Sequence, residues 1–323
     1  MKKQMKKWLS IIGLLVVAVV VAACSSEEAN DDVTDIGILL SADHASLTNA
    51  QDGFIEELEA NGFVDGENAN INILNSQGSS GNLHDMATQL ASENDLLLGI
   101  STSAVQSLAT VADQETPILF TAATDPVGAG VVDSLENPGG NITGTSDMVP
   151  IEQQIQLLFS IVPDAQRVGI IYNSSEPNSQ VQADAATQEI EAAGAEAVIS
   201  TVTSTNDVQQ IAEQLLGEVD ALYIPTDNTL SSAATTVGDL AIEYQVPIVA
   251  GSIDHTAQGG LATYGIDYTS LGRQTGQMAV DILQNGTAPS DIPVETAENL
   301  ELFVNEDMAN ALGIDPESIQ LEE

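Results

Sequence analysis

The sequence predicts an α/β protein with two doubly wound, parallel-sheet domains. Short apolar segments alternate with longer segments of helical periodicity, which is typical of parallel sheets covered by helices on both faces. This alternation starts near residue 33 and starts again near residue 151. The roughly 300 residues that follow a predicted leader exceed the usual size of one hydrophobic core, so we expect two domains.

The first series of elements ends at a cluster of turn-forming residues. In chain order we expect strand 33–40, helix 45–61, strand 70–74, helix 81–92, strand 95–100, helix 101–112 and strand 117–121. The strands are short, largely apolar runs. Turn-forming residues then gather at 137–141, Asn-Pro-Gly-Gly-Asn. We place the first crossing between the domains just after this cluster, near 146–150.

The second series repeats the pattern and leaves a C-terminal remainder. In chain order we expect helix 151–162, strand 167–172, helix 178–193, strand 195–200, helix 206–216, strand 221–224, helix 228–244 and strand 247–250. The remainder contains a strand at 261–266, a helix at 268–284, short strands at 292–295 and 300–304, and a small helix at 306–312. Two similar halves with such a remainder predict that the chain crosses between the domains more than once.

Residues 1–32 have the pattern of an export signal and a tether. Four lysines precede an apolar run of about 15 residues, shorter than the roughly 20 that a spanning helix needs. The run ends in small residues before Cys24, the chain's one cysteine, which resembles the bacterial lipobox apart from Val21. We therefore interpret 1–23 as a signal peptide and 24–32 as a lipidated, flexible tether. The alternative is an uncleaved anchor helix with an incidental cysteine.

The charge balance restricts the partners of the exported chain. The six basic residues include the four lysines of the signal, so Arg167 and Arg273 remain against 48 acidic residues, a formal charge of −46. Such a surface repels nucleic acid and anionic membranes. We favour adaptation to high salt, where counterions screen self-repulsion, over an acidic surface without special salinity. A single cysteine excludes a disulfide framework or a thiolate metal cluster within the chain.

Polar residues follow the expected strands, at the edge where open parallel sheets bind ligands. Helix capping is the alternative role for them, since serine, threonine, aspartate and asparagine are preferred N-caps and we expect each loop to open a helix. Loops of this kind in both halves fit a ligand clamped between two domains better than capping alone. The candidate binding residues are Ser101, Thr102, Ser103, Thr121, Ala122, Thr124, Asp125, Asn173, Ser174, Asn178, Ser179, Thr226, Asp227, Asn228, Gly251 and Asp267.

The chemistry of these loops suits an α-amino acid zwitterion. With two arginines in the exported chain, we expect backbone N–H groups and hydroxyls to hold a ligand carboxylate. Asp125, Asp227 or Asp267 would hold an ammonium group. A sugar or a nucleoside would also fit hydroxyls and amides, so these ligands remain open.

The motifs of enzymes and cofactor sites are missing from the sequence. The three histidines lie in separate segments, which does not favour a metal site. There is no G-x-S-x-G elbow, and the exported chain has no lysine for a phosphate-binding loop. We expect no catalysis and no cofactor.

Several longer motifs carry a resemblance to a known family. They are FTAATDPVGAG at 120–130, PGGNITG at 138–144, YNSSEPNS at 172–179, YIPTDN at 223–228, and GIDY at 265–268 leading into LGRQTG at 271–276. Together they resemble ABC-transporter substrate-binding lipoproteins, in the family with tryptophan- and tyrosine-binding members. The resemblance covers about residues 33–318.

This resemblance implies a type I periplasmic-binding-protein fold with three hinge crossings and a cleft that closes on the ligand. The crossings are expected near 146–150, 265–269 and 288–292, and helix 268–284 returns to the first domain. The N-terminal lobe then comprises 33–147 and 268–290. The C-terminal lobe comprises 148–267 and 291–323.

By the same resemblance, the protein is a monomeric solute receptor of an ABC importer, lipid-anchored to the outer face of the cell membrane. The resemblance implies that it binds a small ligand, namely an amino acid whose side chain can be aromatic. It then works with a permease and its ATPase subunits. Without tryptophan in the exported chain, the candidate aromatic platforms are Phe120, Tyr172, Tyr223 and Tyr268, with core packing as the alternative role. A ligand-binding sensor for a membrane signalling partner and an exported α/β enzyme are the rival interpretations.

Overall fold

A computed structural model describes residues 33–321, which form two six-stranded sheets. The first sheet has the order β11-β5-β4-β3-β1-β2, and all its pairs are parallel. Its strands are β1 (Thr34–Leu40), β2 (Ala69–Asn75), β3 (Leu96–Ile100), β4 (Ile118–Thr121), β5 (Ile142–Ser146) and β11 (Glu295–Thr296). We call this sheet and its helices the first lobe.

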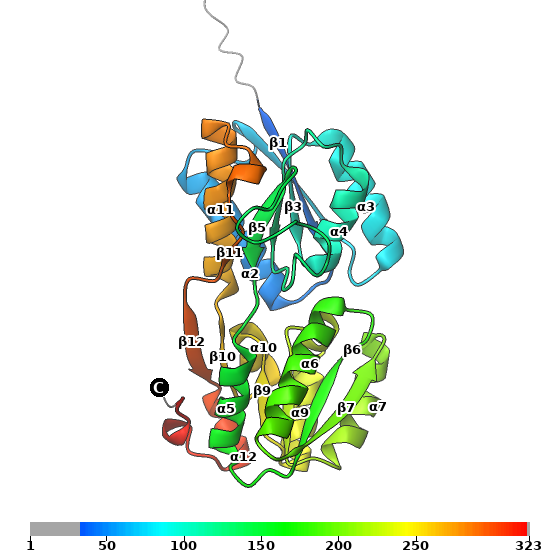
Figure 1. The fold of residues 1–323 in the computed structure, drawn as a ribbon, viewed down its shortest axis with the longest axis vertical. Helices are drawn as coiled ribbons and strands as arrows, with labels where there is room; N and C mark the ends of the chain where they lie inside the picture. Colours follow the sequence, from blue (N-terminus) through cyan, green and yellow to red (C-terminus); the bar gives the residue numbers. More distant parts are fainter. Residues whose placement is uncertain (1–32, 322–323) are drawn as a thin grey trace, which may run out of the picture. The chain divides into compact units, whose positions relative to one another are not determined.

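Helices cover both faces of the first sheet because its central strands are apolar on both sides. Leu97 and Phe120 pack with α3 (Ser80–Glu93) and α4 (Thr102–Val111), whereas their neighbours Leu98 and Leu119 belong to the core on the opposite face. That opposite face carries α2 (Ala45–Ala60) and α11 (Tyr268–Asn285), as Figure 1 shows. The predicted doubly wound arrangement is confirmed.

The second lobe repeats this architecture with the sheet order β12-β10-β9-β8-β6-β7. The pairs are parallel except for β12, which runs antiparallel to β10. Its strands are β6 (Arg167–Asn173), β7 (Glu196–Val202), β8 (Ala221–Ile224), β9 (Ile248–Ala250), β10 (Ala262–Ile266) and β12 (Leu300–Val304). Its helices are α5 (Ile151–Ile161), α6 (Pro177–Ala192), α7 (Thr205–Leu216), α8 (Asn228–Ser232), α9 (Ala234–Tyr244), α10 (Ile253–Gly259) and α12 (Glu306–Leu312).

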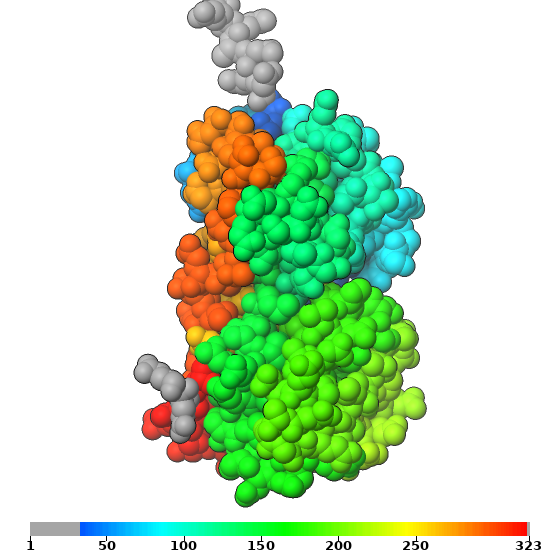
Figure 2. Space-filling model, in the orientation of Figure 1, coloured from blue at the N-terminus to red at the C-terminus, as the bar shows by residue number. Residues whose placement is uncertain are grey.

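The chain passes between the lobes after β5, after β10, and between β11 and β12. The first two places lie beside residues 146–150 and 265–269. The third expectation, near 288–292, is wrong, because η1 (Pro289–Asp291) is followed by β11, which still pairs with β5 of the first lobe. Residues 291–296 therefore belong to the first lobe. In Figures 1 and 2 the chain from η1 to β12 runs along one side from the first lobe to the second.

Four other local features differ from what the sequence predicts. The loop after β4 opens no helix, and the strand β5 that follows it was not expected. The expected helix 228–244 is divided into α8 and α9 at Ala233, and α10 was missed.

Helices α2 and α11 approach each other closely through glycines. A Cβ atom on Gly272 would lie 2.0 Å from the carbonyl oxygen of Ala50, and one on Gly53 would lie 2.0 Å from that of Thr269. Because the two helices pack this closely, the residues at their N-terminal ends keep fixed positions relative to each other.

The leader, the tether and Cys24 lie outside the described residues. Among residues 33–321, none of the helices combines the length and the apolar composition needed to cross a membrane.

Candidate functional site

A small cavity lies where the two lobes meet, at the carboxyl ends of the parallel strands. The first lobe lines it with His44, Ser46, Leu47, Ala122 and Asp147. The second lobe lines it with Asn178, Thr226, Asp227, Asn228, Ser231 and Ser252, and Tyr268 lies at the second crossing. The cavity volume is about 20 Å³, room for one or two water molecules.

Hydrogen bonds close the lobes around this cavity. Asn49 on α2 donates to Asp254 Oδ1 on α10 at 2.7 Å. The hydroxyls of Ser46 and Ser252 are 3.5 Å apart. Residues from both lobes would therefore contact any ligand bound here.

Asp147 is a buried carboxylate at the end of β5. Thr124 Oγ1 donates to its Oδ1 at 2.7 Å, and the Tyr268 hydroxyl donates to its Oδ2. Burial raises the pKa of Asp147, and these two hydrogen bonds act in the opposite direction. Because Asp147 and Tyr268 lie at the first and second crossings, their contact joins two hinge segments beside the cavity.

Asp227 is a second buried carboxylate, from the second lobe. It caps α8 by accepting the Leu230 N–H at 2.8 Å, and its other oxygen accepts the Asn173 N–H at 2.6 Å. Burial first, and then the charge of Glu176, raise the pKa of Asp227 to about 7.

Glu176 organises the adjoining loop. Its carboxylate accepts hydrogen bonds from the backbone N–H groups of Asn228 and Thr229, the Thr229 hydroxyl, and the side-chain amides of Asn228 and Asn173. These contacts fix Asn228 so that its Oδ1 lies 3.1 Å from His44 Nε2 of the first lobe.

Two histidines lie near the cavity, and burial lowers the pKa of both. Burial lowers the pKa of His44, although Asn228, Glu176 and Asp43 act to raise it. His255 on α10 lies with its Nδ1 3.3 Å from Ser231 Oγ, and burial, followed by the charge of His44, lowers its pKa to about 3.

The structure brings together part of the predicted site. Five predicted residues line the cavity: Ala122, Asn178, Thr226, Asp227 and Asn228. Three more contact lining residues, namely Thr124 at Asp147, Asn173 at Asp227, and Ser179, whose hydroxyl donates to the Thr226 carbonyl.

The other predicted residues do not line the cavity. Ser101 caps α4 by accepting the Ala104 N–H, and Ser103 is its exposed neighbour. Thr121 Oγ1 accepts from Thr145 within the sheet. Thr102 and Gly251 are buried, and Ser174 is exposed. Asp125 accepts the Gly128 N–H in a turn.

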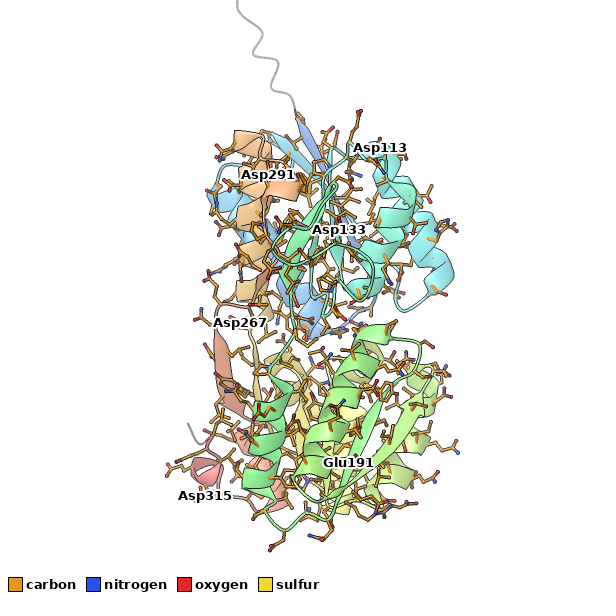
Figure 3. All side chains as sticks on the ribbon, viewed as in Figure 1. Asp113, Asp133, Glu191, Asp267, Asp291 and Asp315 are labelled. Carbon is orange, nitrogen blue, oxygen red and sulfur yellow. The ribbon has the colours of Figure 1, made fainter. Side chains whose placement is uncertain are left out.

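Asp267 occupies a different place from the one expected. It caps α11 by accepting the Thr269 N–H and the Ser270 hydroxyl, and it is exposed. It lines a separate cavity of about 480 Å³ between α11 and the chain that connects α11 to β12. Figure 3 shows Asp267 beside the segments that cross between the lobes.

Among the residues that line the cavity, sequence reasoning missed His44, Ser46, Leu47, Asp147 and Ser231. His44 follows β1, so the rule about strand ends would have found it had it been applied to the first strand. Asp147 follows β5, which was not recognised as a strand. Of the four proposed aromatic platforms, Tyr268 lines the cavity, whereas Phe120, Tyr172 and Tyr223 are buried in the lobe cores.

Comparisons with known proteins identify the family. Residues 35–322 match the family described as ABC transporter substrate binding protein. The tyrosine-binding protein of Clostridioides difficile is 38% identical over 320 residues, covering 95% of this chain and 92% of that protein.

Two solved structures are similar in fold and sequence. An ABC domain from Streptococcus pneumoniae in complex with L-Trp is 36% identical, with a TM-score of 0.84, covering 88% of this chain and 97% of that one. A ligand-free, open substrate-binding protein from Clostridium difficile is 41% identical, but its TM-score is 0.68, over 88% and 96% of the chains. The whole chain is thus more similar in fold to the L-Trp complex than to the open structure. The chain belongs to the ABC transporter substrate-binding proteins, a family of extracytoplasmic binding proteins that are not enzymes.

Proposed function

We propose that this protein binds an α-amino acid with an aromatic side chain between its lobes and presents it to the permease of an ABC importer. The observation that carries the proposal is a cavity lined by two buried carboxylates, Asp147 and Asp227, with no lysine or arginine among its described lining residues. A site with this charge selects a ligand that carries a positive group.

The two carboxylates supply acceptors for an α-ammonium group. An ionised carboxylate has about four lone-pair sites, and the hydrogen bonds of Asp147 and Asp227 leave some of them free. Burial raises the pKa of both groups, and a bound ammonium would lower it again by favouring the charged carboxylate. Ligand binding would therefore stabilise the ionised form of the site.

Neutral donors remain for the ligand carboxylate. The hydroxyls of Ser46 and Ser252 face each other from opposite lobes, and Ser231 adds another hydroxyl to the lining. A carboxylate that accepted from both Ser46 and Ser252 would link the lobes. Binding would then shift the population toward the closed form that engages the permease. The reaction that drives transport, ATP hydrolysis, would take place on partner subunits.

Two observations support an aromatic side chain on the ligand. Relatives of 36–38% identity are a tyrosine-binding protein and a domain in complex with L-Trp. In this chain, Leu47 and the ring of Tyr268 supply apolar and aromatic surface beside the polar groups.

Isothermal titration with L-Tyr and L-Trp tests the ligand class. The variant Asp227→Asn should bind the better of the two at least about tenfold more weakly, because a charged hydrogen bond contributes about 1.5–3 kcal/mol. Asp125→Asn is the matched control, since Asp125 does not line the cavity, and its affinity should equal that of the wild type. If Asp227→Asn binds with unchanged affinity, the Asp227 carboxylate does not contact the ligand.

We also propose that a lipid on Cys24 anchors the mature protein to the outer face of the cell membrane. The basic segment, the apolar run and the small residues before Cys24 support this anchor. Cys24→Ser should move the protein from the membrane fraction to the soluble fraction of cells, as immunoblotting would measure. Equal retention of both forms in the membrane fraction would contradict lipidation.

A further inference from the structure

One residue that lines the interlobe cavity has a polar atom shielded from solvent without a hydrogen-bond partner among the described residues. This atom is Nδ1 of His44, in the loop between β1 and α2. Leaving a buried polar atom unpaired costs free energy, so such atoms are rare in folded proteins. On a residue that lines a binding cavity, such an atom is a candidate for a hydrogen bond with the ligand.

The hydrogen-bond network fixes which kind of contact Nδ1 can make. The side-chain N–H₂ of Asn228 donates to the Glu176 carboxylate at 2.6 Å, which leaves Asn228 Oδ1 facing His44. An amide oxygen can only accept, so His44 Nε2 carries the proton and donates across the 3.1 Å contact. In the neutral ring, Nδ1 is then an acceptor.

The charged surroundings of His44 come from both lobes. Asp43 lies on its own loop, Glu176 and His255 face it from the second lobe, and Asp147 and Asp227 line the same cavity. Desolvation is the largest influence and lowers the pKa of His44, which keeps the ring neutral at neutral pH.

We propose that His44 sets ligand specificity by accepting, at Nδ1, a hydrogen bond from a neutral N–H or O–H donor on the ligand's aromatic side chain. This inference rests on the proposed binding of an aromatic amino acid. The indole N–H of tryptophan and the phenol O–H of tyrosine are donors of this class. The α-ammonium group is better matched by Asp147 and Asp227, because charge-assisted hydrogen bonds to carboxylates are stronger.

The proposal separates ligands with a side-chain donor from phenylalanine, which has none. Bound L-Phe would leave Nδ1 buried and unpaired, whereas L-Tyr or L-Trp would satisfy it. Sites built to accept a ligand hydrogen bond reject analogues that lack the donor much more strongly than apolar pockets reject small changes in size.

Titration calorimetry with L-Tyr, L-Trp and L-Phe tests this role. At pH 7.5 the wild type should bind the better of L-Tyr and L-Trp at least about tenfold more tightly than L-Phe. His44→Phe keeps an aromatic ring but removes the acceptor, and should bring this ratio close to one. His44→Gln can donate to Asn228 and still present an amide oxygen, so it should keep part of the preference.

A pH series and a matched control distinguish recognition from a structural role. As the pH falls through the lowered pKa of His44, the wild-type preference should fall, because a protonated Nδ1 becomes a donor, while that of His44→Gln should stay constant. His84→Phe changes an exposed histidine on α3 and should bind like the wild type.

The outcomes separate the role of His44 from the proposed function. If the wild type binds all three amino acids equally, or if His44→Phe keeps the full preference, the role of His44 is rejected while amino-acid binding stands. If none of the three amino acids binds, the proposed function itself fails.

Discussion

At the scale of single residues, burial sets the charge states around the cavity. Desolvation is the first cause of the raised pKa values of Asp147 and Asp227 and of the lowered values of His44 and His255. Each of these groups is shifted toward its neutral form. The ammonium group of a zwitterionic ligand would lower the pKa values of the two carboxyl groups again. The charge of the ligand and the charge of the site are therefore coupled.

Acid should destabilise the protein through His255. Its folded-state pKa is about 3, against 6.5 for an ordinary histidine, so the unfolded chain binds a proton first as the pH falls. The stability contributed by the neutral ring is complete above pH 6.5 and is lost as the pH falls toward 3. Between pH 7 and 5 His255 by itself should lower the free energy of unfolding by about 2 kcal/mol, whereas Asp227, whose pKa is raised to about 7, should raise it by a similar amount in the wild type.

Urea unfolding at pH 7 and pH 5 measures the contribution of His255. Over this interval the free energy of unfolding of His255→Gln should rise relative to that of the wild type, whereas that of the exposed His84→Gln should change as much as the wild type's. Equal changes in the wild type and in His255→Gln would show that His255 does not contribute.

At the scale of elements, the sequence predicted the apolar strands and missed a polar one. β5 reads Ile-Thr-Gly-Thr-Ser yet is buried throughout, because its hydroxyls are paired. Thr145 Oγ1 contacts the hydroxyls of Thr121 and Thr275, Ser146 Oγ donates to the Thr124 carbonyl, and Thr143 Oγ1 donates to the Ile292 carbonyl. These partners are distant in sequence, so apolar patterning could not reveal the strand.

This missed strand explains why Asp147 is absent from the predicted site. The rule that ligands bind at strand ends found Asn178, Thr226 and Asp227, because their loops follow recognisable strands or open helices. It could not find Asp147 without β5. The position of β11 could not be predicted from the sequence either. This strand consists of two exposed residues and is defined by its pairing with β5.

Helices α2 and α11 connect packing to the site. Their glycine-mediated contact leaves no room for a side chain at Gly53 or Gly272. The N-terminal ends of these helices carry Ser46 and Leu47 on one side and Tyr268 on the other, all of which line the cavity. Close packing therefore fixes these ligand-facing groups relative to each other while the second lobe supplies the remainder.

At the scale of the whole molecule, negative charge is spread over both lobes. Figure 3 labels six carboxylates on different elements, from Asp113 and Asp291 in the first lobe to Glu191 and Asp315 in the second. The ion pairs among residues 33–321 are those of Arg167 with Glu196 and Glu218, and of Arg273 with Glu56, all on exposed side chains. Exposed pairs of this kind contribute little, so self-repulsion is largely uncompensated.

Salt should therefore stabilise the fold. Counterions shorten the range of repulsion from about 10 Å at 0.1 M to about 3 Å at 1 M, and they act on the compact state more than on the expanded unfolded chain. We expect the Tm to rise as NaCl increases from 0.05 M into the molar range, which differential scanning calorimetry would measure. Sodium sulfate at matched ionic strength would separate screening from salting-out, because sulfate also strengthens apolar burial. A Tm that stays flat in NaCl would show that the acidic surface is tolerated without screening, and adaptation to high salt would be rejected.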